Sequence, residues 1–387
     1  MKSPRAVAAT LALLFLSIAP HVIAQLDARM MRTPDISATQ IVFAYASDLW
    51  LVPAGGGTAV RLSSPKGEEL YPHFSPDGKS IAYTANYDGN MDVYVISNAG
   101  GMPVRVTSHG NSERVVGWYP DGKRILFAST MYSGRQRFSQ FFSVPVEGGL
   151  PQPLPLPYAE IGGVSPDGKK LAYTYQTQAF RTWKRYRGGW APDIHVFDLE
   201  KGTDETVAAD VASDEFPMWQ GNKIYFLSDR GTEQRSNIWV YDGATKITRQ
   251  LTHFTDTDVH SPSLGAAGIV FETGGKLFVL DPATGKEQEV AVKVVTDQSS
   301  LLPRTENAAK LIRATAVSPD GKRALFQARG EIFSVPAENG PVYDLTRTPG
   351  AAERYPSWSP DGKTIAYWSD RSGEYELTLM DAGKRTE

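Results

Sequence analysis

The 387-residue sequence contains no cysteine, which excludes disulfide bonds, thiol nucleophiles and thiolate metal ligands. Its formal net charge is only −3, so the composition does not indicate binding to nucleic acid or to an anionic membrane surface. Neither a Gly-x-Ser-x-Gly nucleophile elbow nor a His-Glu-x-x-His zinc motif occurs in it. We therefore expect no catalytic residue, no metal and no cofactor within this chain.

Long helical periodicity is also missing, whereas glycine and proline are plentiful, with 35 and 26 copies. This balance is typical of strands joined by turns. Hydrophobic residues make up 41% of the sequence, which is enough to build large cores. The composition therefore favours an all-β protein.

Only the N-terminus carries a long apolar run, from Ala6 to Ile18, behind a positively charged start. The run is short for a bilayer span, and Val22 and Ala24 provide the small residues of a cleavage site. We therefore predict a signal peptide over residues 1–24, a periplasmic or secreted protein, and no membrane-spanning segment after cleavage. An uncleaved membrane anchor is the alternative.

One short turn occurs five times, as in YPHFSPDGKSIAYTA. Its proline presets the backbone for a turn, its aspartate bonds its own backbone, and its glycine supplies a positive φ. The alternating residues that follow the turn, such as Ile81 and Tyr83, indicate a half-buried strand. A third strand and often a fourth follow in each unit, which is the signature of a propeller blade. The five turn prolines are Pro76, Pro120, Pro166, Pro319 and Pro360.

Three further units keep the same frame without the Pro-Asp-Gly turn. The aligned positions are Ile36, Phe74, Trp118, Val164, Trp219, Leu264, Val317 and Trp358. A stretch without strand alternation separates the sixth unit from the seventh. We predict a six-bladed β-propeller over residues 33–292, a linker over 293–310, and the first blades of a second, incomplete propeller over 311–387. A single eight-bladed ring is the alternative.

Three stretches resemble the tricorn-type serine peptidases, and in particular their exported bacterial homologues. They are DLWLVPAGGG, WKRYRGGWAPDIHVFDLE and, most specifically, residues 318–377. The resemblance implies a large modular peptidase that trims oligopeptides, with propellers that filter or channel the peptides. It also implies that the PDZ-like domain and the catalytic serine-peptidase domain lie outside this chain. Whether the protein forms a homo-oligomer is left open.

Two basic hairpins are the candidate substrate-binding sites. The hairpin MYSGRQRF presents Arg135 and Arg137, and the hairpin RTWKRYRGGW presents Arg185 and Arg187. The resemblance implies that basic residues of the first propeller help to receive the C-terminal carboxylate of a peptide, a role that suits the fork of an arginine. Solvated hairpin tips are the alternative interpretation of both stretches.

The leading hypothesis is therefore the substrate-handling and gating propeller region of an exported tricorn-type peptidase that degrades oligopeptides. The first alternative is a non-enzymatic periplasmic interaction propeller of the TolB type, whose Pro-Asp-Gly-Lys repeat is similar. TolB-like proteins carry an α/β domain before the propeller, whereas here the first unit starts soon after the predicted cleavage site. A propeller-fronted amidohydrolase or prolyl-peptidase is the second alternative. The sequence beyond Glu387 would decide between them.

Overall fold

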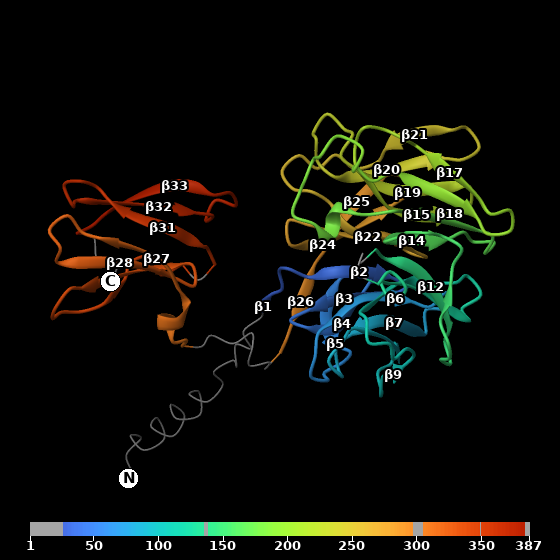
Figure 1. Ribbon diagram of the computed structural model, residues 1–387, viewed down its shortest axis with the longest axis horizontal. Coiled ribbons are helices and arrows are strands. Elements are labelled where there is room, and N and C mark those ends of the chain that lie inside the picture. Colours follow the sequence, from blue (N-terminus) through green and yellow to red (C-terminus); the bar gives the residue numbers. More distant parts are fainter. Residues whose placement is uncertain (1–25, 135–137, 297–304, 349, 384–387) are drawn as a thin grey trace, which may run out of the picture. The chain divides into compact units, whose positions relative to one another are not determined.

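The computed structural model describes residues 26–134, 138–296, 305–348 and 350–383. The chain divides into two compact units, Met1–Ser300 and Leu301–Glu387. Nearly all regular structure in the described residues is β-strand, and the two helices among them are single 3-10 turns (Figure 1). These turns are η1 (Gln178–Phe180) and η3 (Ala308–Leu311).

Six sheets make up the described part of the first unit, and neighbouring strands in each sheet mostly follow one another along the chain. Sheet 1 contains β2 (Arg32–Ile36), β3 (Gln40–Tyr45), β4 (Asp48–Pro53), β5 (Gly57–Arg61), β26 (Val292–Val294) and β1 (Leu26–Asp27). Sheet 2 contains β6 (Glu69–Phe74), β7 (Ser80–Ala85), β8 (Asp92–Ser97) and β9 (Val104–Arg105). Sheet 3 contains β10 (Glu113–Trp118), β11 (Arg124–Ser129), β12 (Gln140–Pro145) and β13 (Gln152–Pro153).

The next three sheets repeat this order. Sheet 4 contains β14 (Ile161–Val164), β15 (Lys170–Thr174), β16 (Ile194–Asp198) and β17 (Thr203–Val207). Sheet 5 contains β18 (Asp214–Gln220), β19 (Lys223–Ser228), β20 (Asn237–Asp242) and β21 (Ile247–Gln250). Sheet 6 contains β22 (His260–Gly265), β23 (Gly268–Thr273), β24 (Lys276–Asp281) and β25 (Lys286–Val290).

The repeated Pro-Asp-Gly turn joins the first two strands of a sheet through the same set of bonds in four of its five copies, and the fifth has Tyr119 in place of the serine. Between β6 and β7, Gly78 has φ +70° and donates its N–H to the carbonyl of Ser75 at 2.8 Å. Asp77 Oδ1 accepts the Ser75 hydroxyl at 2.6 Å and the Lys79 N–H at 3.1 Å, and these bonds hold the pKa of Asp77 below its usual range. The turn itself therefore accounts for the repeated aspartate. The same serine–aspartate bond recurs at Ser165, Ser318 and Ser359.

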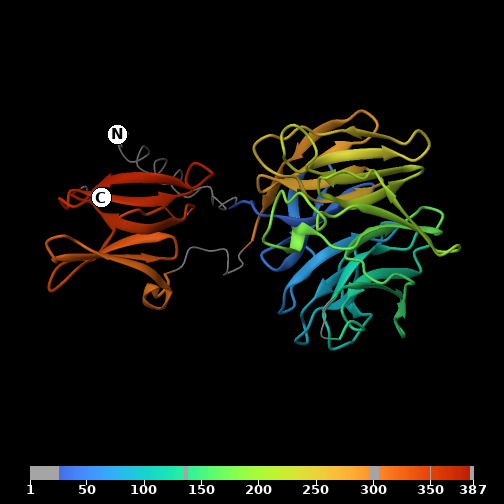
Figure 2. The same ribbon diagram turned by 45° about the horizontal axis from the view of Figure 1, so that its top comes forward.

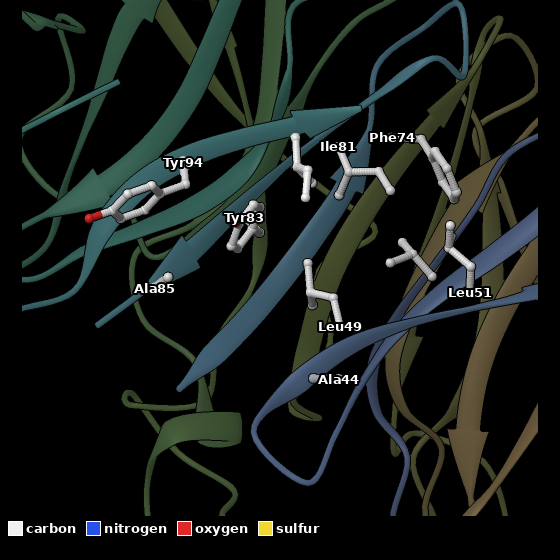
Figure 3. Packing of buried hydrophobic residues seen from close by; sticks show 10 residues of the cluster. Ala44, Leu49, Leu51, Phe74, Ile81, Tyr83, Ala85 and Tyr94 are labelled. Atoms are coloured by element: carbon white, nitrogen blue, oxygen red, sulfur yellow. The ribbon is translucent and has the colours of Figure 1, made fainter. Parts of the chain in front are cut away.

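The hydrophobic cores lie between neighbouring sheets. Leu49 and Leu51 of sheet 1 pack against Phe74, Ile81 and Tyr83 of sheet 2, and all five are buried (Figure 3). Equivalent clusters fill the gaps between sheets 2 and 3, 3 and 4, 4 and 5, and 5 and 6. Each sheet thus covers its apolar faces only against its neighbours, which makes every sheet dependent on the next one.

Sheet 6 packs back onto sheet 1, as the contact between β22 and β2 shows (Figures 1 and 2). Arg32 of β2 forms an ion pair with Glu272 of β23 at 2.8 Å. Gly265 approaches Ile36 so closely that a Cβ at Gly265 would lie 1.6 Å from the Ile36 carbonyl oxygen. The β-propeller predicted from the sequence is confirmed, and the number of blades in its ring stays a prediction that this order of sheets supports.

Two extra strands extend the outer edge of sheet 1. The chain leaves β25 and enters β26, which pairs in parallel with β5, and β1 then pairs antiparallel with β26. Gly57 donates its N–H to the Ala291 carbonyl at 2.8 Å, and a Cβ on Gly56 would lie 2.8 Å from the same oxygen. The glycines of the DLWLVPAGGG stretch therefore leave room for the chain that comes from sheet 6.

The second unit holds two sheets in its described part. The first contains β27 (Ile312–Val317), β28 (Arg323–Ala328), β29 (Glu331–Pro336) and β30 (Tyr343–Asp344). The second contains β31 (Glu353–Trp358), β32 (Thr364–Ser369) and β33 (Glu376–Asp381). They enclose a small cluster of buried side chains, which comprises Leu325, Ile332, Leu345, Ile365 and Tyr367.

Candidate functional site

A cavity of about 750 Å³ lies among the first strands of the six sheets in the first unit. Each of these innermost strands, β2, β6, β10, β14, β18 and β22, contributes residues to its wall. The volume is in the range of sites that bind small molecules and short peptides. Apolar and aromatic residues form much of the wall, among them Leu70, Phe74, Val116, Trp118, Phe216 and Met218.

Five of the innermost strands, β2, β6, β10, β18 and β22, carry a β-bulge where they face the cavity, and in four of them a residue with positive φ lies at the bulge. Thr33, Tyr71, Phe216 and Ser261 have φ between +45° and +55° and line the cavity. Each falls at a break in the pairing with the next strand of its sheet. A bulge sets two residues against one and turns a side chain away from the regular pleat. Such strained positions are often found at functional sites.

The segment between β15 and β16, residues 175–193, forms a strap that contributes side chains to the same cavity. Arg181 binds both carboxylate oxygens of Glu160 at 2.7 Å. The Arg187 guanidinium reaches sheet 5, where it binds the buried carboxylate of Asp229 at 2.6 Å. Ion pairs with a buried partner hold geometry more firmly than fully exposed pairs.

The strap also reaches the segment between sheets 5 and 6. Arg185 donates from Nε to the Gln234 carbonyl at 2.7 Å and lies 3.2 Å from the carboxylate of Asp258. Lys184 lies 3.6 Å from the same carboxylate. The strap of sheet 4 is therefore tied across the cavity wall to groups more than 40 residues away in the chain.

Glu215 of β18 anchors the beginning of the strap. Its buried carboxylate accepts the Thr177 hydroxyl at 2.6 Å and the backbone N–H of Gln178. Burial raises the pKa of Glu215 to about 7, while these hydrogen bonds act in the opposite direction. The first turn of the strap is therefore bound to a carboxyl group that changes its charge near neutral pH.

Asp35, His73 and Ser263 meet in the cavity wall at the junction of sheets 1, 2 and 6. The Ser263 hydroxyl donates to Asp35, whose second oxygen accepts the Phe74 N–H at 2.6 Å. His73 Nδ1 lies 3.9 Å from Asp35, and burial lowers the pKa of this histidine. The serine is bonded to the aspartate and not to the histidine, so the imidazole does not activate it as a nucleophile. The trio ties three sheets together.

Arg114 of β10 is a further cation in the cavity wall. Its guanidinium lies 4.1 Å from the ring centre of Phe180 in the strap and 5.8 Å from that of Tyr71, and it donates to the carbonyl of Glu160. Tyr71 and Phe180 also meet edge to face, with ring centres 6.1 Å apart. These three residues come from sheets 2, 3 and 4 and meet only in the folded chain.

The four arginines predicted to bind substrate differ in where they lie relative to the cavity. Arg185 lines the cavity, and Arg187 does not, although it holds the strap through Asp229. Arg135 and Arg137 lie outside the described residues. Whether any of the four binds substrate stays a prediction.

Sequence reasoning missed Arg114, Tyr71, Phe180 and Glu215 as cavity residues. The available signal was a charged or aromatic residue a few positions before each aligned inner residue, as in ERVVGW before Trp118. That signal says nothing about which side chains from different sheets come together.

Across the described ranges, no group of three or more histidine, aspartate or glutamate side chains is placed to hold a metal ion. Nor does that part of the chain contain a helix with the length and apolar character needed to cross a membrane.

The chain is similar in sequence to proteins of one known family. Residues 28–286 match the family of the tricorn protease N-terminal β-propeller domain. The chain is 28% identical over 382 residues to tricorn protease homolog 1 of Streptomyces coelicolor, and this match covers 91% of the chain and 33% of the homolog. It is 26% identical over 334 residues to a tricorn protease homolog of Saccharolobus solfataricus, which covers 86% of the chain and 31% of that protein.

A solved structure agrees with these sequence matches at the level of the fold. The crystal structure of the tricorn protease aligns with 93% of this chain and 35% of its own, with a TM-score of 0.61 and 22% identity. The chain spans about a third of the length of the curated relatives it matches.

Proposed function

We propose that this chain, which belongs to the tricorn protease family through its N-terminal β-propeller domain, is the substrate-handling region of an exported serine peptidase that degrades oligopeptides. The family supports a tricorn-like propeller region directly. Export rests on the predicted signal peptide over residues 1–24, and the peptide substrates rest on the family resemblance. The catalytic serine and the PDZ-like domain would belong to parts of the protein outside this chain.

The strap across the cavity is the observation that carries this proposal. A cavity of about 750 Å³ can take a short peptide, and its apolar wall with a few charged groups suits both side chains and ends of such a ligand. The strap meets the wall through ion pairs and single hydrogen bonds. Contacts of this kind can open and close without loss of the hydrophobic cores between the sheets. We assign the strap a gating role on this basis.

The domain arrangement is part of the same proposal. Residues 33–292 would form one closed six-bladed propeller, residues 293–310 a linker, and residues 311–387 the start of a second propeller. The return of sheet 6 onto sheet 1 supports the closed ring. The division of the chain at residue 300 supports a linker in this region.

Peptide binding to the full chain tests the proposed function. Calorimetry with capped peptides of three, five and eight residues, rich in alanine and phenylalanine, should detect saturable binding of at least one length. In the double variant Arg181→Ala, Arg187→Ala the peptide should enter and leave several-fold faster, because two ties of the strap are removed. Stopped-flow tryptophan fluorescence can follow both rates, since Trp118 and Trp219 line the cavity.

Lys169→Ala is the matched control for the strap. It removes an exposed ion pair with Glu200 at 3.0 Å, at the end of β15 that is opposite the strap. Its binding rates should equal those of the wild type. Unchanged rates in the double variant would remove the gating role, and failure of every peptide to bind would favour a non-enzymatic interaction propeller.

A further inference from the structure

Each innermost strand of the first unit stands at the end of its sheet, so one of its edges has no strand partner in that sheet. In four of these strands a proline lies two positions before the aligned inner residue, where it provides no N–H. A bulge interrupts β10, which has no proline at this position. Prolines and bulges both hinder the pairing of an edge with a further strand. The four prolines are Pro34 in β2, Pro72 in β6, Pro217 in β18 and Pro262 in β22.

The innermost strand of sheet 4, β14, has neither feature. Its register with β15 runs unbroken over all four of its residues. These residues are all half-buried, and all four line the cavity. Gly162 takes the place that proline has in the four other strands. A Cβ at Gly162 would lie 2.5 Å from the carbonyl oxygen of Ala172, so close packing accounts for the glycine and excludes a proline there. The free edge of β14 is therefore regular.

The hydrogen bonds between β14 and β15 show which backbone groups face this free edge. Ser165 donates its N–H to the Lys170 carbonyl at 2.8 Å, so Gly163 is the next residue that bonds to β15. In an antiparallel pair every second residue bonds to the partner strand, and the residues between direct their N–H and C=O to the other edge. Gly162 and Val164 are these residues. Among the described residues, the N–H and C=O groups of these two make no hydrogen bond to any other part of the chain.

The neighbouring innermost strands provide apolar surface on both sides of β14. β14 contacts β10 of sheet 3 and β18 of sheet 5. Val116 and Trp118 of β10 line the cavity, as do Phe216 and Met218 of β18. Successive side chains of an extended peptide point in opposite directions. A peptide that lies along β14 would therefore direct its side chains alternately toward these two apolar surfaces.

We infer that a peptide in an extended conformation binds in the cavity as an added strand on β14, paired with the N–H and C=O groups of Gly162 and Val164. This inference deepens the proposed function and rests on it. Three residues of an extended peptide span the distance from Gly162 to Val164. Pairing of this kind recognises the main chain of the ligand, and side chains add selectivity only where pockets receive them. The ligands are thus oligopeptides of varied sequence that can become extended.

A scan of N-methylated peptides on the full chain tests this pairing. The parent peptide consists of a central phenylalanine between two pairs of alanines, and it is acetylated and amidated so that it carries no charge. Each backbone N–H is methylated in turn, which removes one donor and leaves the side chains unchanged. Only alternate residues of an added strand donate to the neighbouring strand, whichever way the peptide runs. The affinity should therefore fall about five- to tenfold at every second position and stay the same at the positions between.

Two matched variants locate the pairing on β14. Val164→Pro removes an N–H from the free edge and puts a ring in its place, so it should weaken binding of the parent peptide about fivefold. Val317→Pro is the control. Val317 is the aligned residue of β27, which also ends its sheet, and its N–H faces the free edge in the same way. It does not line the cavity, so this variant should bind the peptide like the wild type.

The outcomes are distinguishable. An equal loss at every methylated position, or no loss at any, would overturn the inference and leave the proposed function standing. An alternating pattern with unchanged affinity in Val164→Pro would also overturn it, because the peptide would then pair with a different strand. Equal weakening in Val317→Pro would show that the effect of proline does not arise at β14. The scan needs no variant, so it tests the pairing even if Val164→Pro does not fold. If no capped peptide binds the wild type, the proposed function is contradicted as well.

Discussion

A buried carboxylate stands at the first position of several innermost strands and accepts hydrogen bonds from neighbouring loops and sheets. Glu69 accepts the N–H of Leu49 at 2.7 Å and the Ser63 hydroxyl, both from the sheet 1 part of the chain. Glu113 accepts the hydroxyl of Thr107, which precedes it in the link from sheet 2. These acids join one sheet to the next through groups that are out of contact with water. The remaining members of this set are Asp214 and Glu353.

Glu113 should make the stability of the protein depend on pH. Burial raises its pKa from 4.5 to about 7, so the folded chain holds this proton more strongly than the unfolded chain. The stabilising contribution is complete below pH 4.5 and is lost as the pH rises through 7. Between pH 5.5 and pH 8, the difference in unfolding free energy between Glu113→Gln and the wild type should therefore shift in favour of the variant by about 1–2 kcal/mol.

Chemical denaturation of both proteins at the two pH values measures this shift. Glu147→Gln is the control, because Glu147 is exposed beside β12 of the same sheet. A constant difference between Glu113→Gln and the wild type across this range would contradict the prediction.

Gly265 sets the closest approach between sheets 6 and 1. A Cβ at this position would lie 1.6 Å from the carbonyl oxygen of Ile36, so Gly265→Ala must push two inner strands apart. We expect it to lower the free energy of unfolding by about 3 kcal/mol, in the range of overpacked cores. Gly117→Ala is the control, since nothing lies within 4 Å of a Cβ at that inner-strand position. Equal melting temperatures for the two variants would be inconsistent with a tight junction.

At the scale of elements, different interactions hold the strands and the strap in place. The strands are fixed by backbone ladders and by apolar side chains on both faces. The strap has a single 3-10 turn, and its described residues around Phe180, Tyr186 and Trp190 are exposed at 42%, 40% and 64%. Its position depends on a few polar ties, so it should open more easily than any strand.

The rate of tryptic cleavage within the strap should measure this opening, because trypsin cleaves after lysine and arginine. The strap contains Arg181, Lys184, Arg185 and Arg187. Arg187→Gln removes the pair with Asp229 and should speed cleavage after the other three residues several-fold. Mass spectrometry of early fragments measures the rate, and Arg124→Gln serves as control. A strap that is cut at the wild-type rate in Arg187→Gln would show that the Asp229 pair does not hold it.

The turns and strands could be predicted from the sequence, but the contacts between side chains of different sheets could not. The Pro-Asp-Gly turn could be predicted because all of its bonds lie within six residues, from Ser75 to Ser80. The insertion before β16 was visible as extra length, but its ties could not be predicted, since Arg185 and Asp258 are 73 residues apart. Arg114 was missed for the same reason, because Tyr71 and Phe180 approach it from other sheets. Neither local pattern nor spacing carries that information.

At the scale of the whole molecule, the two units differ in how many sheets support each other. The first has six sheets in its described part and the second has two. In the second unit several apolar side chains remain exposed, among them Leu377 at 61% and Leu379 at 65%. Since each sheet is stabilised by its neighbours, the second unit should be the less stable one.

Hydrogen exchange should therefore be faster in residues 311–387 than in sheets 2 to 5. Limited proteolysis should cut between residues 294 and 310 and leave the first unit intact, because the sequence of the predicted linker lacks sustained strand alternation. Exchange in the second unit as slow as in sheets 2 to 5, or uniform cutting across all sheets, would instead support a single eight-bladed ring.

The parallel pairing of β26 with β5 has a mechanical consequence. Consider tension that is applied to the C-terminal end of β26 along the axis of that strand. The bonds to β5 on one side and to β1 on the other are then loaded in shear and share the force, whereas a peeling strand would lose its bonds one by one. The load passes into sheet 1 and bypasses the seam where β22 meets β2 without a covalent link. A pull along β26 would thus load the outer edge of sheet 1 and spare the contact between sheets 6 and 1.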